Sequence, residues 1–169
     1  VTSVAIGQES TQVTPIQLAN YISTLVNGGT RYSTHLLKTV KSSDFSQVTY
    51  EYEPQVQAEL DIAEDNLNAV TQGMLNLTTE DGSLANAFRN VPVQVGAKTG
   101  SAQVSSTSDS NAVFVCYAPY DDPEIAISLV VEHGGSGSVL ASLAAEILNY
   151  YFSAQENQGD VVTENTLVP

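Results

Sequence analysis

The stretch GAKTGSAQ, residues 96–103, places one of the three lysines of the chain between two glycines and beside hydroxyl groups. The ammonium group of Lys98 and the hydroxyls of Thr99 and Ser101 can bind a carboxylate through charge-assisted hydrogen bonds. Gly100 has no side chain, so a substrate backbone can approach it closely, and a free N–H on an edge strand can donate to a developing oxyanion. The stretch therefore suits recognition of a peptide carboxylate or an acyl group, although an ordinary surface strand could end in the same common residues.

Other residue types that often carry chemistry are few in this sequence. Cys116 lies in the apolar run AVFVCYAP and is expected to be a buried small side chain rather than a reactive thiol. His35 and His133 stand at the ends of expected strands, where a structural or solvated role is favoured over a catalytic one. No cluster of His, Cys and carboxylates has the spacing of metal ligands, so the sequence predicts no metal and no cofactor.

The composition limits the class of protein. The 169 residues suit one domain, and 42% hydrophobic residues are enough for a packed core. A formal net charge of −14 argues against nucleic acid and against a polybasic membrane contact, because both need clustered Lys and Arg. A single cysteine allows no disulfide within the chain.

Targeting signals are not apparent in the sequence. No apolar run approaches the roughly 20 residues that a membrane span needs. Residues 1–10 lack the basic start of a signal peptide. Any anchor or export signal is therefore expected to lie outside this chain.

The elements that must position these residues follow from periodicity and turn residues. Thr14 before Pro15 predicts a helix start, and Asn27, Gly28 and Gly29 predict its end. Helices are expected over three segments: 15–26, 55–77 and 139–152. Strands are expected over four segments: 34–41, 94–102, 112–117 and 125–132. The remaining segments are read as polar loop or hairpin over 42–54 and as loop with at most one helical turn over 78–90.

The order of the elements predicts an α+β fold with an antiparallel sheet and helices packed on it. The turn-rich segment APYDDPE links the last two strands, which are expected to pair as an antiparallel hairpin. The strand over 125–132 is almost continuously apolar and needs a neighbour on both sides. The sheet is therefore expected to be incomplete within this chain.

Two ordered blocks of sequence resemble the transpeptidase domain of class B penicillin-binding proteins. The first is AIGQESTQVTPIQLANYISTLVNGGTRYSTHLLK, which begins at Ala5, and the second is VGAKTGSAQ, which ends at Gln103. The glycine-rich segment 134–137 also resembles the family, whereas the resemblance fades over 42–90 and over the tail. It implies a partial transpeptidase fold of the penicillin-binding protein and serine β-lactamase type, with its N-terminal half missing.

The resemblance implies roles for the residues of the second block. Lys98 resembles the lysine that shapes the electrostatics beside a serine nucleophile. Thr99 and Ser101 resemble hydroxyls that meet the substrate carboxylate, and the Ser101 N–H resembles an oxyanion-hole donor. Gly100 resembles the residue that keeps the strand open to the substrate. The implied substrate-binding set is Thr99, Gly100, Ser101, Ala102 and Gln103, with Lys98 and Ser101 as the catalytic residues. The implied reaction is cross-linking of stem peptides that end in D-alanyl-D-alanine, through a serine acyl-enzyme that β-lactams also form.

The chain departs from the family pattern in one large respect. No lysine has a serine three places before it, so the Ser-x-x-Lys motif that supplies nucleophile and base is absent. No asparagine has a serine two places before it, so Ser-x-Asn is absent too. Ser108-Asp109-Ser110 follows Lys-Thr-Gly instead of preceding it and is read as a surface loop. We therefore expect 1–152 to be the C-terminal portion of a transpeptidase domain and 153–169 to be a polar tail.

The resemblance also implies partners and a location. The expected partners are a companion polypeptide that carries Ser-x-x-Lys and Ser-x-Asn, the stem peptides of peptidoglycan, and β-lactams. The expected location is the outer face of the bacterial cytoplasmic membrane, with the anchor in a segment absent from this chain. Alone, the chain is expected to be inactive.

Two other readings stay open at this point. One is a non-catalytic sensor or scaffold that recognises penicillin and has lost its nucleophile. The other is half of a β-lactamase, which shares Lys-Thr-Gly. The TPIQLAN stretch and the Ser-Ala-Gln that ends the second block favour the penicillin-binding protein over the β-lactamase.

Overall fold

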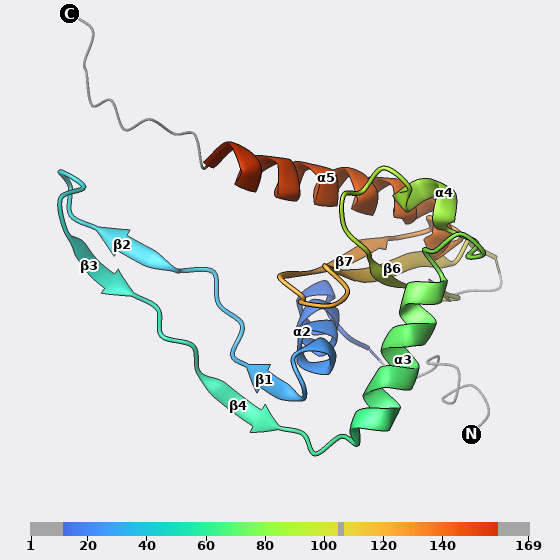
Figure 1. The fold of residues 1–169 in the computed structure, drawn as a ribbon, viewed down its shortest axis with the longest axis horizontal. Helices are drawn as coiled ribbons and strands as arrows, with labels where there is room; N and C mark the ends of the chain where they lie inside the picture. The colour runs from blue at the N-terminus through green and yellow to red at the C-terminus, as the bar shows by residue number, and fades with distance from the viewer. Residues whose placement is uncertain (1–11, 105–106, 159–169) are drawn as a thin grey trace, which may run out of the picture.

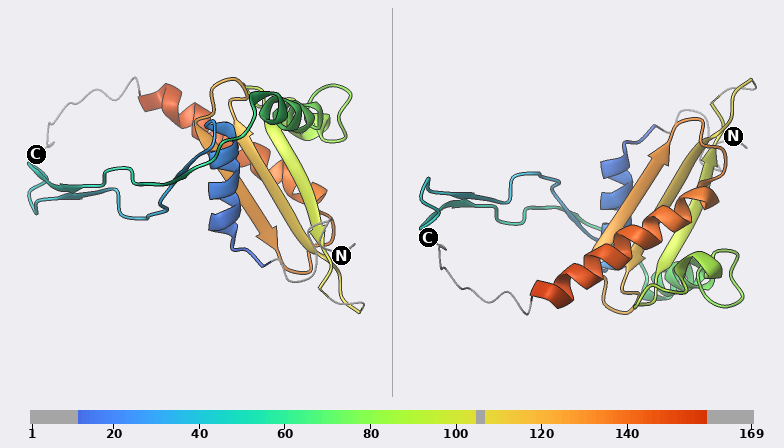
Figure 2. Two further views of the ribbon diagram at one scale, coloured as in Figure 1. Left: turned by 90° about the horizontal axis from the view of Figure 1, so that it is seen from below. Right: turned by 90° about the horizontal axis from the view of Figure 1, so that it is seen from above.

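A three-stranded antiparallel sheet forms the centre of the molecule in the computed structural model, which describes residues 12–104 and 107–158. The strands are β5 (Gly96–Ala102), β6 (Asn111–Ala118) and β7 (Ile125–Val131), in that order across the sheet. Helix α5 (Ala141–Gln158) crosses one face of this sheet, and α2 (Pro15–Val26) and α3 (Glu64–Asn76) lie on the other face (Figures 1 and 2). The expected α+β fold and the antiparallel pairing of the last two strands are confirmed.

Apolar side chains are buried on both faces of the sheet. On the face toward α5, buried residues of β6 pack against the helix, chiefly Ala112, Phe114 and Cys116 against Ala144 and Leu148. On the opposite face a smaller cluster joins Ile22 of α2 and Met74 of α3 to Val115 and Tyr117. The period-2 alternation of β6 therefore divides its side chains between two hydrophobic layers.

Helix α2 begins and ends as its sequence predicts. Thr14 forms a capping box with Gln17, whose side chain accepts from the Thr14 N–H at 2.8 Å, and Pro15 occupies the first turn. Gly28 and Gly29 then have φ values of 84° and 102°. A Cβ at Gly29 would collide with the Leu60 carbonyl, so this position requires glycine for two reasons.

A two-stranded arm extends from the body between α2 and α3 (Figure 1). Its base pairs β1 (Thr30–Tyr32) with β4 (Val56–Glu59), and its tip pairs β2 (Thr39–Lys41) with β3 (Val48–Glu51). All side chains of β3 are exposed. The pairing of β2 with β3 confirms the hairpin alternative for 42–54. The strand expected over 34–41 is shorter in the structure and spans only Thr39–Lys41.

One expected helix start is wrong. The helix expected over 55–77 begins only at Glu64, and 56–59 is strand β4 instead. The apolar spacing of Val56, Leu60 and Ala63 fits a helix, but Val56 pairs with Tyr32 of β1 and the Leu60 N–H donates to the Gly29 carbonyl. Pairing with β1 satisfies the backbone here, so a tertiary contact overrides the local periodicity.

The closing helix is longer than expected. A short 3₁₀ helix, η1 (Gly137–Leu140), leads into α5, which continues to Gln158. The expected division between domain and tail at 152/153 therefore falls inside α5. Residues 159–169 lie outside the described part of the chain, so this division stays a prediction. Ile6, Gly7 and Gln8 of the first block also lie outside the described residues. The expected loop over 78–90 contains one helical turn, α4 (Ala85–Phe88).

None of the helices within 12–104 and 107–158 combines the length and the apolar character needed to cross a lipid bilayer.

Candidate functional site

Strand β5 carries the Lys-Thr-Gly sequence at an edge of the sheet. Within the described residues, β6 is its only strand neighbour, and Lys98 stands opposite Val115 while Gly100 stands opposite Val113. On an edge strand, alternate N–H and C=O groups point away from the sheet and stay available to a ligand. The expectation of a free backbone edge at this motif thus agrees with the topology.

Lys98, Thr99 and Gly100 share one cavity of about 570 Å³ between the sheet, α2 and α3. Lys98 is exposed, and its Nζ donates to the Thr99 carbonyl at 2.6 Å. The rest of the cavity wall is mainly apolar and comes from three elements: Leu18, Tyr21, Ile22 and Leu25 of α2, Ala69, Val70, Gly73 and Met74 of α3, and Val113 and Val115 of β6.

Several of these apolar side chains remain accessible to solvent. Tyr21 of α2 is 61% exposed, and Val70 of α3 is 48% exposed. Helical spacing assigns Val70 to a core and gives no signal for Tyr21, which is why sequence reasoning placed neither of them in the site. Their exposure beside a lysine shows that α2 and α3 present an open apolar wall to this cation.

Ser101 makes its contact away from that cavity. Its Oγ accepts a hydrogen bond of 3.4 Å from the Gly137 N–H, at the start of η1. Ala102 is half-buried and Gln103 is exposed, and neither lines the cavity that holds Lys98. The structure therefore brings Lys98, Thr99 and Gly100 together and leaves the last three residues of the motif outside that cavity.

Gly137 is the glycine of segment 134–137 that lies against the Lys-Thr-Gly strand. It is buried, and a Cβ at this position would collide with the carbonyls of Val113 and Gly100 and approach the Gly100 nitrogen to 2.8 Å. The backbone of η1 thus lies directly against the paired backbones of β5 and β6. Only glycine permits this approach. The close packing of η1 holds β5 in place at the Lys-Thr-Gly sequence.

The other residues singled out in the sequence lie elsewhere. His35 belongs to the arm, where its ring stacks on Tyr52 with ring centroids 3.4 Å apart. His133 has a φ of 55°, its backbone N–H donates to the Asn111 side chain at 3.0 Å, and its ring Nδ1 lies 3.2 Å from the Asp109 carbonyl oxygen. Cys116 is fully buried, and burial raises the pKa of its thiol to about 12. These positions support structural roles for all three side chains.

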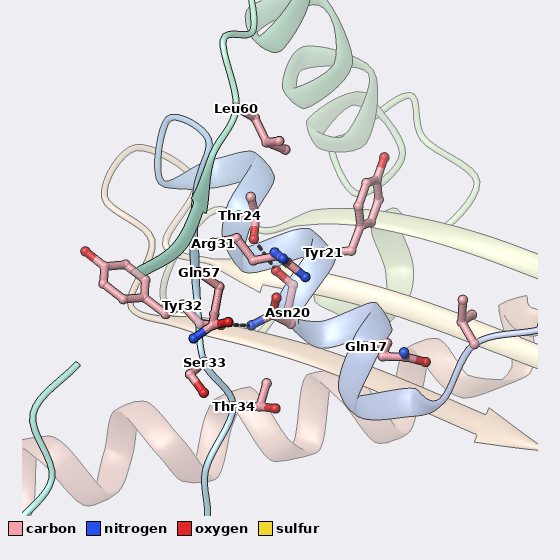
Figure 3. Close-up of a pocket in the computed structure, with 11 residues that line it drawn as sticks. Gln17, Asn20, Tyr21, Thr24, Arg31, Tyr32, Ser33, Thr34, Gln57 and Leu60 are labelled. Atoms are coloured by element: carbon pink, nitrogen blue, oxygen red, sulfur yellow. Dashed lines mark hydrogen bonds between the residues drawn. The ribbon is translucent and has the colours of Figure 1, made fainter. Parts of the chain in front are cut away.

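A second hollow, of about 490 Å³, lies where the arm meets α2 (Figure 3). The Asn20 side chain donates to the Tyr32 carbonyl at 2.9 Å, and Thr24 Oγ1 donates to the Asn20 carbonyl at 2.7 Å. Arg31 of β1 also lines this hollow (Figure 3). The Asn20–Tyr32 hydrogen bond attaches the base of the arm to the helix, so we interpret this hollow as a structural junction.

The part of the chain that the structure describes holds no group of three His, Cys, Asp or Glu side chains able to bind a metal ion.

Comparison with known proteins shows which family this chain resembles in sequence. The family model described as penicillin binding protein transpeptidase domain matches residues 1–149. Penicillin-binding protein 2A of Bacillus subtilis is 32% identical over 91% of the chain, and the match spans 24% of that protein. Peptidoglycan D,D-transpeptidase MrdA of Haemophilus influenzae is 30% identical over 89% of the chain, and the match spans 25% of that protein.

The fold is similar to solved structures as well. Penicillin-binding protein A of Mycobacterium tuberculosis, solved as an imipenem acyl-enzyme complex, superposes with a TM-score of 0.75. That match covers 89% of this chain and 33% of the solved chain, at 22% sequence identity. The present chain thus spans about a quarter of the length of the curated relatives and a third of this structure.

Proposed function

The chain belongs to the penicillin-binding protein transpeptidase family, in its class B, and on that premise we propose that it forms one wall of the active site of a peptidoglycan D,D-transpeptidase. The observation that carries the proposal is the position of Lys98, Thr99 and Gly100. They lie on the edge strand β5 and line one cavity, and the free backbone edge of β5 lies beside that cavity. A substrate peptide can lie along such an edge as an additional strand.

The proposed reaction is acyl transfer in two steps. A serine hydroxyl, supplied from outside this chain, attacks the carbonyl between the two D-alanines of a stem peptide. The C–N bond breaks, the serine becomes an ester, and the terminal D-alanine leaves with the serine proton. An amine of a second stem peptide then attacks the ester, forms the new amide bond, and returns the proton to the serine. A β-lactam ring opens by the first step alone.

Each residue of the motif has a proposed role in these steps. The Lys98 ammonium stabilises negative charge that develops beside the serine, in a cavity whose apolar walls strengthen its field. Thr99 and Ser101 donate to the terminal carboxylate of the stem peptide, and the Ser101 N–H donates to the oxyanion. Gly100 admits the substrate backbone. Ala102 and Gln103 continue the strand along which the peptide lies.

We further propose a companion portion that carries Ser-x-x-Lys and Ser-x-Asn. Two apolar surfaces support it. The cavity beside Lys98 is open, and β7 has β6 as its only strand neighbour within the described residues. Val130 and Val131 at the end of β7 are 38% and 43% exposed. An additional strand on β7 would cover this edge, which otherwise invites aggregation.

The complete protein is proposed to act at the outer face of the cytoplasmic membrane, where the stem peptides are cross-linked. An anchor for that location would lie in a segment other than these 169 residues. The resemblance of the chain to Bacillus subtilis penicillin-binding protein 2A and to MrdA supports peptidoglycan as the substrate class.

The test is the intact mass of every polypeptide after incubation with a penicillin. The chain is measured alone and together with the portion that carries Ser-x-x-Lys. We expect the chain alone to gain nothing, and the companion to gain the mass of the drug only when this chain is present. A mass gain on this chain itself would show that it holds a nucleophile and would overturn the assignment.

The same experiment also tests the alternative function, a non-catalytic sensor or scaffold. The absence of Ser-x-x-Lys from these 169 residues also fits a non-catalytic module that recognises penicillin or serves as a scaffold. If no polypeptide is acylated, equilibrium dialysis with labelled penicillin separates the cases. Reversible binding would favour the sensor, and a lack of binding would favour the scaffold.

A further inference from the structure

Helix α2 makes only a small contact with the sheet beneath it. The helix lies over β7, on the face opposite α5 (Figure 2), and its buried residues are Ile22 and Thr24. Ile22 packs on the sheet, in the small cluster with Val115 and Tyr117. Thr24 comes two residues later, about 200° further round the helix, so it faces away from the sheet. The sheet therefore contacts α2 through one fully buried side chain and several half-buried ones.

This contact also leaves a polar atom of β7 without a partner. Ser128 stands opposite Val115 in the β6–β7 pair, so its side chain lies on the same face of the sheet, the face on which α2 packs. Its hydroxyl is buried and has no hydrogen-bond partner within the described residues. A buried hydroxyl without a partner costs free energy that is recovered when water reaches it. Separation of α2 from the sheet would let water reach it.

Hollows border α2 where it meets the sheet. The cavity beside Lys98 reaches Leu18, Ile22 and Leu25 of the helix. A smaller hollow, of about 230 Å³, lies between Ser23 and Val26 of the helix and the start of β7. Side chains that line a hollow lack contacting atoms on one side, so they gain less dispersion energy than side chains in a filled core. Little packing energy therefore opposes movement of α2 away from the sheet.

The side-chain hydrogen bonds that link α2 to another element run to the arm in the described part of the chain. The Asn20 side chain donates to the Tyr32 carbonyl of β1 at 2.9 Å. Directly after the helix, the Asn27 side chain donates to the Thr30 carbonyl at 2.6 Å and accepts from the Thr30 N–H at 2.9 Å. Thr24 lies at the same junction. Helix α2 is thus attached more firmly to the base of the arm than to the sheet.

We propose that α2 and the base of the arm, β1 and β4, form one unit that separates from the sheet at a lower free energy than global unfolding. Separation removes the α2 wall of the cavity beside Lys98, so the arm and that cavity are coupled. A partner that binds the arm more tightly in one of the two states shifts the balance between them. The separation itself does not rest on the transpeptidase function; only its effect on acylation does, and separation can be measured without acylation.

The test is labelling of thiols in the full 169-residue chain with an aromatic disulfide under native conditions. Cys116 is fully buried between β6 and α5 and serves as the internal reference for global unfolding. Ile22→Cys places a second thiol at the contact between α2 and the sheet, and peptide mapping separates the two sites. We expect the thiol of Ile22→Cys to be labelled about 10-fold or more faster than Cys116. Equal rates would mean that α2 leaves the sheet only on global unfolding and would overturn the proposal.

Thr24→Cys tests whether the arm moves with the helix. Each rate is divided by that of Cys116 in the same molecule, which corrects for any change in global stability. Because the arm stays on the helix in the open state, the thiol of Thr24→Cys should be labelled at least about fivefold more slowly than that of Ile22→Cys. Equal labelling of the two variants would show that α2 leaves both neighbours, which contradicts a joint unit.

Ser128→Ala tests the hydroxyl without a partner. Combined with Ile22→Cys, it should slow labelling of both thiols about fivefold or more, because it stabilises the closed state relative to the open and the unfolded states. Slower labelling of Cys116 alone would show that the opening does not uncover Ser128, and the proposed contact would be wrong. Ser142→Ala is the control, since it removes an exposed hydroxyl from α5 and should leave the rate at Ile22→Cys unchanged.

Discussion

Lys98 is the residue whose surroundings differ most from those of an ordinary surface lysine. It lies on a strand edge, its ammonium donates to the Thr99 carbonyl, and apolar residues of α2 and α3 line the rest of its cavity. Lys98 is itself exposed, so its charge would act at a lower effective dielectric only when a bound ligand or a companion chain excludes water from these walls. The apolar walls would then contribute to its proposed chemistry, as the glycines and hydroxyls beside it do.

This role predicts the effect of removing the ammonium. In the assembled domain we expect Lys98→Ala to slow acylation by penicillin about 100-fold or more, the usual range for loss of a group that handles protons or charge in the transition state. The measurement is the rate of mass gain on the companion. Lys41→Ala removes the same charge from the exposed tip of the arm and should leave the rate unchanged. Acylation of the Lys98 variant at the original rate would refute the role.

Gly137 and Gly73 form a matched pair for testing the close approach behind β5. At Gly137 a Cβ would collide with two backbone carbonyls, whereas at Gly73 of α3 it would meet no atom within 4 Å. We expect Gly137→Ala to lower the free energy of unfolding by about 1–3 kcal/mol. Gly73→Ala should raise it by about 0.5–1 kcal/mol, since alanine favours the helix. Urea unfolding measures both, and equal effects of the two changes would rule out the proposed contact.

At the scale of elements, local signals predicted most of the fold. The capping box at Thr14 and Gln17, the double glycine after α2, and the apolar runs of β6 and β7 each have a short-range cause, and each element is present. The start of α3 was wrong because β4 forms through pairing with β1, a contact between segments more than 20 residues apart. Single-sequence periodicity contains no information on such a contact.

The candidate site, like the fold, was predictable only in part. Lys98, Thr99 and Gly100 were selected as candidates by their residue types together with the family resemblance of the blocks around them. The α2 and α3 walls of their cavity were not, because a stripe such as Leu18, Ile22 and Leu25 looks identical whether it faces a filled core or an open cavity.

The arm is the element that adds least to the stability of the body. Both strands of its tip are largely exposed, and the base is attached through the Asn20–Tyr32 hydrogen bond and the Gly29–Leu60 pair. Replacement of residues 35–53 by an Asn-Gly turn should therefore change the free energy of unfolding by less than about 0.5 kcal/mol. Asn20→Ala, which cuts the attachment, should cost about 1 kcal/mol. A larger loss from shortening the arm than from Asn20→Ala, in urea unfolding, would show that the tip supports the body.

At the scale of the whole molecule, the distribution of exposed apolar side chains is uneven. The sheet is well covered by α5 on one face, while in the described part of the chain β7 has no second strand neighbour and the cavity beside Lys98 stays open. A net charge of −14 opposes random association. It does not satisfy the free backbone groups of an edge strand, which pair with any strand that fits.

The β7 edge therefore gives a prediction about assembly. Alone at high concentration, the chain should self-associate, and with the companion present it should form a one-to-one complex instead. Val130→Lys places a charge on the exposed end of β7, a common means of blocking edge pairing, so it should reduce both associations. Sedimentation velocity measures the first, and the companion concentration that gives half-maximal acylation measures the second.

Val139→Lys is the control, because it adds the same charge at a 62% exposed position of η1, away from the sheet edge. We expect it to leave self-association and companion binding unchanged. If both lysine variants behave alike, added charge alone explains the result and the edge is not the docking surface. If only Val130→Lys blocks the complex, the sheet of this chain is completed by a strand from its companion. The serine and Lys98 would then meet only when that strand is in place.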